Sequence, residues 1–322
     1  MCQRQNPSVF GGEGTYLKKG EWESVAAFRH FRSTNHYQGT NQVPALKPFG
    51  PINTQSLLNL DLTYGLTPRW NLSLDVPLEF NRWPIKMAPP GSTVRSVWWQ
   101  NGANGLGDVG VRVRYWLFST EQARANVGLS FGVQAPTGDA DVTANLFGQQ
   151  APVDLTTQLG QHAWSYSPTV QAFWTIAPRG SAISWTPYIT ATYLINPQDT
   201  TGVQSLYGYL QHVNFPNSST DQYLVEVGFS TNSPFSWLSP QLSYVIDGVP
   251  SHDLIGRSDG FRRPATLNFI QPGFTVSLGR NNFTFGLPIA TYINVENSPI
   301  IQKVVDATVP GIMWELTYST RF

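Results

Sequence analysis

The chain of 322 residues carries 20 Lys and Arg against 20 Asp and Glu, so its formal net charge is zero. Only 12% of the residues are charged although 41% are hydrophobic, whereas an average soluble domain carries about 25% charged residues. The neutral balance argues against a nucleic-acid partner, and no apolar run is long enough for a membrane-spanning helix, which needs about 18 residues.

Alternation of apolar and polar residues is the main signal along the chain. From Trp70 to Phe80 every even position is apolar, and the odd positions are polar apart from Pro77. This pattern places the two sets of side chains on opposite faces of a strand. Repeated along the chain, it predicts about twelve strands of the length that a bilayer requires. In chain order they span 22–32, 54–65, 69–80, 107–118, 125–136, 163–176, 184–195, 221–231, 237–247, 266–279, 282–291 and 311–322.

The connections between these strands alternate between short and long. The short ones are 66–68, 119–124, 177–183, 232–236 and 280–281, and the long ones are 33–53, 81–106, 137–162, 196–220, 248–265 and 292–310. In an up-and-down barrel this order places the short turns at one end and the long loops at the other, as in outer-membrane barrels, and we expect short periplasmic turns and long extracellular loops. The sequence therefore predicts an all-β fold, a single transmembrane antiparallel barrel over 22–322. Residues 1–21 are expected to form a periplasmic segment or a plug in the lumen.

Aromatic residues at strand ends next to the short turns predict a girdle at one membrane interface. Its expected members are Trp22, Trp70, Trp174, Trp185, Trp237, Phe283 and Phe322. The alternative is that they anchor the core of a soluble β domain, which does not explain their placement beside one class of turn. Phe322 also ends an alternating strand, and this ending resembles the signature by which the barrel-assembly machinery recognises outer-membrane proteins.

The N-terminal residues raise two expectations about processing. A barrel has to cross the inner membrane, so we expect that a signal peptide has been removed and that the mature protein resides in the bacterial outer membrane. Cys2 is the only cysteine, which excludes an internal disulfide framework. It is a candidate for lipidation, and an unmodified cysteine is the plainer alternative.

Three segments resemble one family of bacterial outer-membrane proteins. They are YGLTPRWNLSL at 64–74, GLGDVG at 105–110, followed by Arg112 and Tyr115, and GVQAPTGD at 132–139, with Pro272-Gly273-Phe274 as a weaker match. They are similar to the strand-turn-strand, strand-entry and PTGD elements of the transporters named for the meta-pathway of phenol degradation. The resemblance covers roughly 56–139, departs from the family at Ala135, and does not extend to the first forty residues. It implies a barrel that passes small, often aromatic or hydrophobic, compounds across the outer membrane.

The polar faces of the strands supply candidate lumen residues. A charge facing lipid at mid-depth costs about 2–4 kcal/mol, so charged strand residues are expected to point inward. The lumen and constriction candidates are Asp75, Glu79, Asp108, Arg112, Arg114, Glu226, Asp247 and Glu315. Arg112 and Arg114 are expected to face Asp75 and Glu79 across a constriction, or else to form internal salt bridges without a role in permeation.

Three inward aromatic residues, Trp116, Phe173 and Tyr188, offer a stacking surface to an aromatic solute. Their alternative role is to pack the lumen.

The sequence favours neither an enzyme nor a cofactor or metal site. His162 with Ser165 or Ser167 is the local Ser/His grouping considered for catalysis, and nothing specific supports catalysis there. The acidic turn at Gly138, Asp139 and Asp141 lacks the ligand spacing of an EF-hand, so a solvated turn is favoured over a calcium site.

The function expected from these features is passive uptake or efflux of small solutes, aromatic or hydrophobic ones among them, through a narrow polar lumen. The alternative is a structural or assembly barrel whose long loops bind protein partners. The expected contacts are outer-membrane lipids and lipopolysaccharide, a small-molecule solute and, during biogenesis, the assembly machinery.

Overall fold

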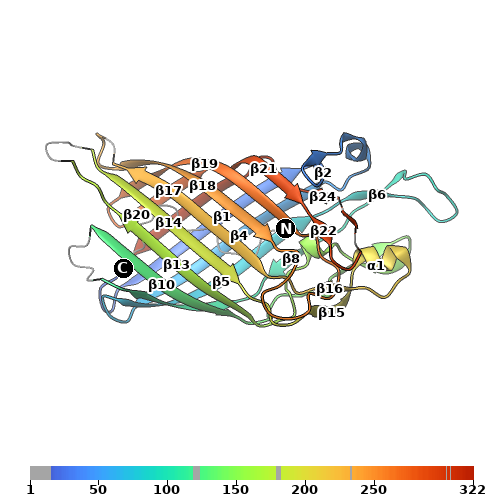
Figure 1. Ribbon diagram of the computed structural model, residues 1–322, viewed down its shortest axis with the longest axis horizontal. Helices are drawn as coiled ribbons and strands as arrows, with labels where there is room; N and C mark the ends of the chain where they lie inside the picture. The colour runs from blue at the N-terminus through green and yellow to red at the C-terminus, as the bar shows by residue number, and fades with distance from the viewer. Residues whose placement is uncertain (1–15, 119–123, 179–182, 233, 302, 305) are drawn as a thin grey trace.

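The computed structural model describes residues 16–118, 124–178, 183–232, 234–301, 303–304 and 306–322. Twelve antiparallel strands form a closed barrel (Figure 1). Two of the twelve are interrupted and consist of two segments each, β8 with β9 and β20 with β21. The strands are β1 (Trp22–Ser33), β4 (Asn53–Gly65), β5 (Trp70–Arg82), β8 (Gly102–Leu106) with β9 (Gly110–Trp116), β10 (Ala125–Gln134), β13 (Ser165–Trp174), β14 (Trp185–Leu194), β17 (Gln222–Thr231), β18 (Leu238–Val249), β19 (Ala265–Leu278), β20 (Asn281–Gly286) with β21 (Ile289–Val295), and β25 (Trp314–Arg321).

The first and last strands close the barrel. Glu23 to His30 of β1 pair with Arg321 to Trp314 of β25, and Trp22 and Phe322 exchange two backbone hydrogen bonds of 3.0 Å. No sheet edge is therefore left open, which is the condition for a β-sheet to cross a bilayer.

The apolar face of the strands points outward. In β5, Leu72 and Leu74 are 37% and 43% exposed, whereas their neighbours Ser73 and Asp75 are 7% and 4% exposed. A soluble β domain would bury the leucines and expose the polar residues. The barrel phase predicted from the alternation is thus confirmed.

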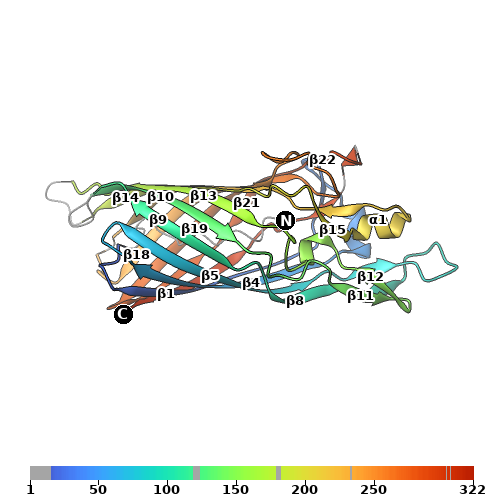
Figure 2. The ribbon, with the colours of Figure 1, turned by 90° about the horizontal axis from the view of Figure 1, so that it is seen from below.

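Short turns and long loops lie at opposite ends of the barrel, as predicted. Figure 1 shows the C-terminus at the end with the short turns and α1 beyond the other end, and Figure 2 shows β11, β12 and β15 gathered with α1 there. We call these the short-turn end and the long-loop end. The long loops contain β2 (His36–Gln38), β3 (Asn41–Gln42), η1 (Pro44–Phe49), β6 (Ile85–Met87), β7 (Val97–Trp99), β11 (Thr143–Leu146), β12 (Gln149–Pro152), η2 (Leu155–Thr157), β15 (Thr200–Gln204), α1 (Leu206–Gln211), β16 (Pro216–Ser218), β22 (Asn297–Ser298), β23 (Lys303–Val304) and β24 (Ala307–Thr308).

Three predicted strand boundaries were wrong. The strand expected at 107–118 begins at Gly102 and is interrupted at 107–109, and the one expected at 282–291 reaches Val295 with a break at 287–288. Pro288 explains the second break, because proline has no N–H for the ladder. The last strand begins at Trp314 rather than at 311. No helix among the described residues is long and apolar enough to cross a membrane.

Candidate functional site

A belt of charged side chains lines the interior of the barrel. Inward strand positions carry seven carboxylates and four arginines, namely Glu23, Asp61, Asp75, Glu79, Glu226, Asp247 and Glu315 with Arg29, Arg112, Arg114 and Arg321. Most of them are buried, and Glu226 is only 1% exposed. The interior is thus polar and carries more negative than positive groups.

The arginines of β9 lie beside the carboxylates of β4 and β5. Arg112 Nη2 lies 3.1 Å from Asp75 Oδ2, and Asn59 Nδ2 donates to Asp75 Oδ1 at 2.7 Å. Asp61 lies directly opposite Asp75 in the ladder. Arg112 therefore compensates Asp75, one of two carboxylates that face each other on neighbouring strands.

The expected partnership of Arg114 with a carboxylate is not seen. Arg114 Nε donates to Ser130 Oγ at 3.4 Å, and its guanidinium lies 5.7 Å from the centre of the Trp116 ring. Within the described part of the chain Arg114 makes no ion pair. Glu79 is 4% exposed and accepts from Asn81 Nδ2 at 2.8 Å.

A second group of carboxylates lies on β17, β18 and β25. Tyr188 Oη donates to Glu226 Oε1 at 2.9 Å, and Gln271 Nε2 donates to Glu315 Oε2 at 3.0 Å. Arg29 lies opposite Glu315 in the β1–β25 ladder, and Asp247 is 4% exposed on β18. Each group of the belt thus combines carboxylates with an arginine or with hydrogen-bond donors.

Asp108 was expected on a lumen-facing strand position but lies outside the strands. It lies in the break between β8 and β9, where Oδ1 accepts from the backbone N of Gly138 at 3.0 Å and Oδ2 from the backbone N of Gln161 at 3.1 Å. Its carboxylate thus holds both ends of the loop between β10 and β13.

The three aromatic candidates form one cluster at the short-turn end of the lumen. Trp116, Phe173 and Tyr188 are 0%, 7% and 4% exposed, and Tyr16 packs edge-on against Trp116 with ring centres 5.0 Å apart. The residue opposite Trp116 is Gly128, where a Cβ atom would lie 2.9 Å from the indole ring. The absence of a side chain at Gly128 therefore leaves the space that the Trp116 ring occupies.

The N-terminal segment reaches this cluster from the short-turn end. Leu17 is 1% exposed, and the backbone N of Gly20 donates to the carbonyl oxygen of Gly65 at 2.8 Å. Tyr16 and Leu17 thus fill part of the lumen, which the alternation of the strands does not reveal because these residues belong to no strand.

Loops cover the long-loop end of the lumen. Gln55, an inward residue of β4, donates from Nε2 to the carbonyl oxygen of Thr156 in η2 at 2.9 Å. Arg263 Nη1 binds both carboxylate oxygens of Asp154, the residue before η2, at 2.8 and 2.7 Å. The loop between β10 and β13 is thereby tied to the wall and to the loop between β18 and β19.

An apolar cluster, which the sequence analysis missed, lines one side of the same end. Its buried members are Phe31, Leu224, Val245, Val249, Ala265, Leu267, Phe269, Ile293, Val295, Ala307, Val309 and Met313. Several of these residues come from inward strand positions, and Ala307 and Val309 come from the last long loop. The cluster anchors that loop inside the barrel mouth.

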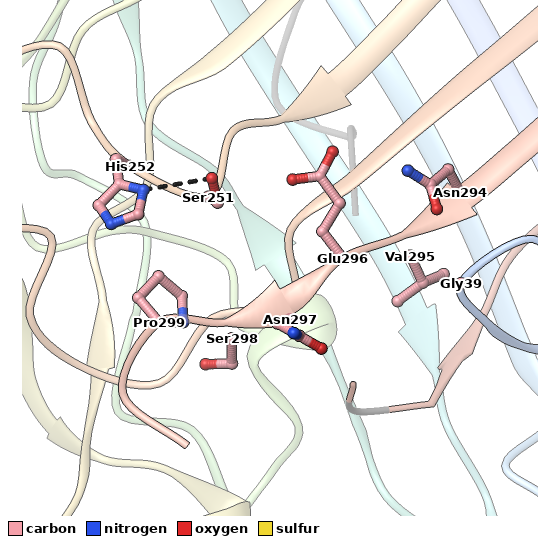
Figure 3. Close-up of a pocket in the computed structure, with 9 residues that line it drawn as sticks. All are labelled: Gly39, Ser251, His252, Asn294, Val295, Glu296, Asn297, Ser298 and Pro299. Atoms are coloured by element: carbon pink, nitrogen blue, oxygen red, sulfur yellow. Dashed lines mark hydrogen bonds between the residues drawn. The ribbon is translucent and has the colours of Figure 1, made fainter. Parts of the chain in front are cut away.

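Two of the pockets in the described part of the chain lie among the loops. One, of about 600 Å³, contains Glu296 and His252, whose Nδ1 lies 3.2 Å from Ser251 Oγ (Figure 3). The other, of about 840 Å³, lies between the β11–β12 hairpin, the segment after β6 and α1. Its lining includes Met87, Phe147 and Tyr209 but no Asp, Glu, Lys or Arg side chain.

All seven expected girdle residues have exposed side chains, from Trp22 at 38% to Trp174 at 62%. Trp22 packs on Tyr64 and Trp70 on Tyr115, each at 4.6 Å between ring centres. Their contact with lipid head groups stays a prediction.

His162 Nδ1 lies 3.2 Å from the carbonyl oxygen of Thr201, not beside the serines considered for it. Cys2 lies outside the described residues.

Comparisons with known proteins place the fold. No family model matches the chain, and no curated protein matches it either. Among solved structures, the chain is similar to the COG4313 outer membrane channel from Pseudomonas putida F1, with 14% identity over 99% of this chain and 100% of that one and a TM-score of 0.60. It is also similar to the β domain of the Bordetella autotransporter BrkA, with 10% identity over 94% and 100% of the two chains and a TM-score of 0.47. At these identities the likeness to the COG4313 channel shows the fold alone, a closed β-barrel of the outer-membrane type.

Proposed function

We propose that the protein is an outer-membrane channel for the passive passage of small solutes. The observation that carries this proposal is the charged belt, enclosed by a barrel whose outer face is apolar. Eight strands leave an interior filled by side chains and sixteen leave an open channel, so twelve strands suit a narrow path. The COG4313 protein of the same fold is itself described as an outer membrane channel, which supports the proposal.

We infer that the solutes are small molecules with an aromatic or other apolar part. The pocket between the β11–β12 hairpin and α1 has no Asp, Glu, Lys or Arg in its lining, so it favours the neutral apolar part of a solute at the long-loop end. Ligand sites are mostly apolar with few polar contacts. Trp116, Phe173 and Tyr188 lie further along the lumen, where they are buried and pack against Tyr16, so an aromatic solute would stack on them only by taking the place of Tyr16. The resemblance to the phenol meta-pathway transporters points to the same solute class.

We also infer that residues 16–21 act as a partial plug; residues 1–15, the rest of the segment expected there, lie outside the described residues. Tyr16 and Leu17 occupy the short-turn end of the lumen, so a solute has to pass beside them or displace them. This predicts a small conductance.

Conductance of the purified protein in planar bilayers tests the proposal. We expect a small, stable single-channel conductance that an aromatic acid reduces and a sugar of similar mass does not. Liposome swelling with the same two solutes supplies the comparison without an applied voltage. Absence of both conductance and swelling from correctly folded protein would contradict the channel.

The second candidate function is a scaffold that binds protein partners through its loops. Exposed apolar side chains at loop positions favour it, among them Val94, Phe147, Leu254 and Ile255. A protein without conductance that co-purifies with a defined partner would establish this alternative.

A further inference from the structure

Fixed charges are almost absent from the outer face of the barrel. At the outward positions of the twelve described strands, Arg32 and Arg82 are the only Lys, Arg, Asp or Glu residues. Both are exposed. A charge on the lipid-facing surface is unfavourable except near the interfaces. We therefore expect an anionic group from the surroundings to compensate these two arginines.

The two arginines lie at the same height. Arg32 of β1 pairs with Thr54 of β4, and Thr54 pairs in turn with Arg82 of β5. Strands lie about 4.8 Å apart, so the two Cα atoms are about 10 Å apart on one row across three strands. Two arginine side chains at this spacing can converge on one group between them.

An aromatic row lies directly below the arginine row. His30, Ser56 and Phe80 occupy it, the His30 ring lies 5.3 Å from that of Trp314, and Phe80 is 48% exposed. Aromatic side chains on the outside of a barrel mark the level of the lipid head groups. The arginines are therefore at head-group height in the leaflet at the long-loop end.

The loops above the pair add positive charge and no negative charge. Residues 33–52 and 83–101 contain Lys47, Lys86 and Arg95 but no Asp or Glu. The two loops touch, since the backbone N of Ile52 donates to the carbonyl oxygen of Pro84 at 2.9 Å. Within the described residues neither Arg32 nor Arg82 forms an ion pair, so both guanidinium groups are available to an external anion.

We propose that Arg32 and Arg82 bind a phosphate group of the phosphorylated glycolipid, lipopolysaccharide, that fills the outer leaflet. Guanidinium groups bind phosphate through paired, charge-assisted hydrogen bonds. The acyl chains of the same lipid would lie on the apolar outer face below, where Phe80 and Leu60 are exposed. This binding is independent of solute transport, because the pair lies on the outside of the barrel.

Binding of lipid A to the detergent-purified protein, measured by native mass spectrometry, tests the proposal. The probes are lipid A with both phosphates, the same lipid A after enzymatic removal of its phosphates, and inorganic phosphate alone. The test variant is Arg32→Gln with Arg82→Gln. Its matched control is Arg69→Gln with Arg280→Gln, which removes two exposed arginines next to the short turns at the other end.

We expect phosphorylated lipid A to bind the wild type and the control variant equally. It should bind the Arg32→Gln, Arg82→Gln variant about thirtyfold more weakly. Dephosphorylated lipid A should bind the wild type as weakly as the phosphorylated lipid binds that variant. This arm needs no mutation, so the test holds even if the double variant fails to fold. Heat-modifiable electrophoretic mobility reports the folded state of each variant.

Equal binding of phosphorylated and dephosphorylated lipid A by the wild type would overturn the proposal. An unchanged affinity in the folded double variant would overturn it as well. Full displacement of lipid A by millimolar inorganic phosphate would assign the pair to a free anion, which also contradicts a lipid site.

Discussion

Arg112 is the cation of the charged belt whose contacts are best defined. It binds Asp75, which faces Asp61 across the β4–β5 ladder. Removing Arg112 and Arg114 therefore leaves an interior with seven carboxylates and two arginines, so the field inside the lumen becomes more negative.

We predict that the Arg112→Ala, Arg114→Ala double variant prefers cations several-fold more strongly than the wild type. The reversal potential in a salt gradient across a planar bilayer measures this preference. Arg69→Ala, which removes an exposed arginine outside the lumen, is the control and should leave the potential unchanged. An unaltered preference in the double variant would mean that these arginines do not line the ion path.

The aromatic cluster leads to a second prediction at the scale of single residues. Trp116→Ala removes a fully buried ring from the contact with Tyr16 and Phe173, and so widens the lumen at the short-turn end. We expect a larger single-channel conductance than that of the wild type. Trp70→Ala removes an exposed indole from the outer face and should leave the conductance as it was; equal conductances of the two variants would show that the cluster does not limit the path.

At this scale the sequence predicts which way a strand residue points more readily than what it touches. Asp75 and Glu226 were expected inward because lipid does not tolerate their charge. The partners of Arg114 and Glu79 could not be inferred, since they depend on the ladder register and on side-chain reach. The role of Tyr16 was missed because a short segment outside the strands carries no periodic pattern.

Among the elements, the long loops are more ordered than their sequences suggest. The Asp154–Arg263 pair joins the loop that carries η2 to the loop between β18 and β19, and both side chains are largely buried, at 1% and 12% exposure. Loss of one partner of a buried pair is strongly destabilising because the other charge is left without compensation.

We predict that Arg263→Ala loosens residues 139–161, so that their backbone amides exchange hydrogen about 100-fold faster. Hydrogen exchange followed by mass spectrometry measures this change. Arg257→Ala is the control, because Arg257 pairs with Asp199 and Asp259 while remaining 81% exposed, and exposed pairs contribute little. Equal exchange rates in both variants would show that the pair does not hold the loop.

The strands themselves could be predicted from the sequence because each has one lipid-facing and one lumen-facing side. The breaks at 107–109 and 287–288 could not be placed in this way. Around Asp108 the backbone leaves the ladder to meet Gly138 and Gln161, and these contacts span dozens of residues. Asp154 and Arg263, which join two loops, are also far apart in the sequence, so no local sequence pattern predicts their contact.

The whole molecule is an inverted β protein, with leucine and aromatic side chains outside and charged side chains inside. A charged fraction of only 12% follows from this arrangement, because most of the outer surface meets hydrocarbon rather than water. The closed ladder and the outward phase of β5 belong to the same arrangement, and the channel and the lipid site both depend on it.

Spin-label accessibility along β5 in lipid nanodiscs tests this arrangement most directly. Single cysteines are placed at 71, 72, 73 and 74 after Cys2 has been replaced by serine, and each carries a nitroxide. We predict that labels at 72 and 74 collide freely with oxygen dissolved in the lipid, while those at 71 and 73 are shielded from it. Equal accessibility at all four positions, or the opposite alternation, would contradict a barrel with an apolar exterior and a polar lumen.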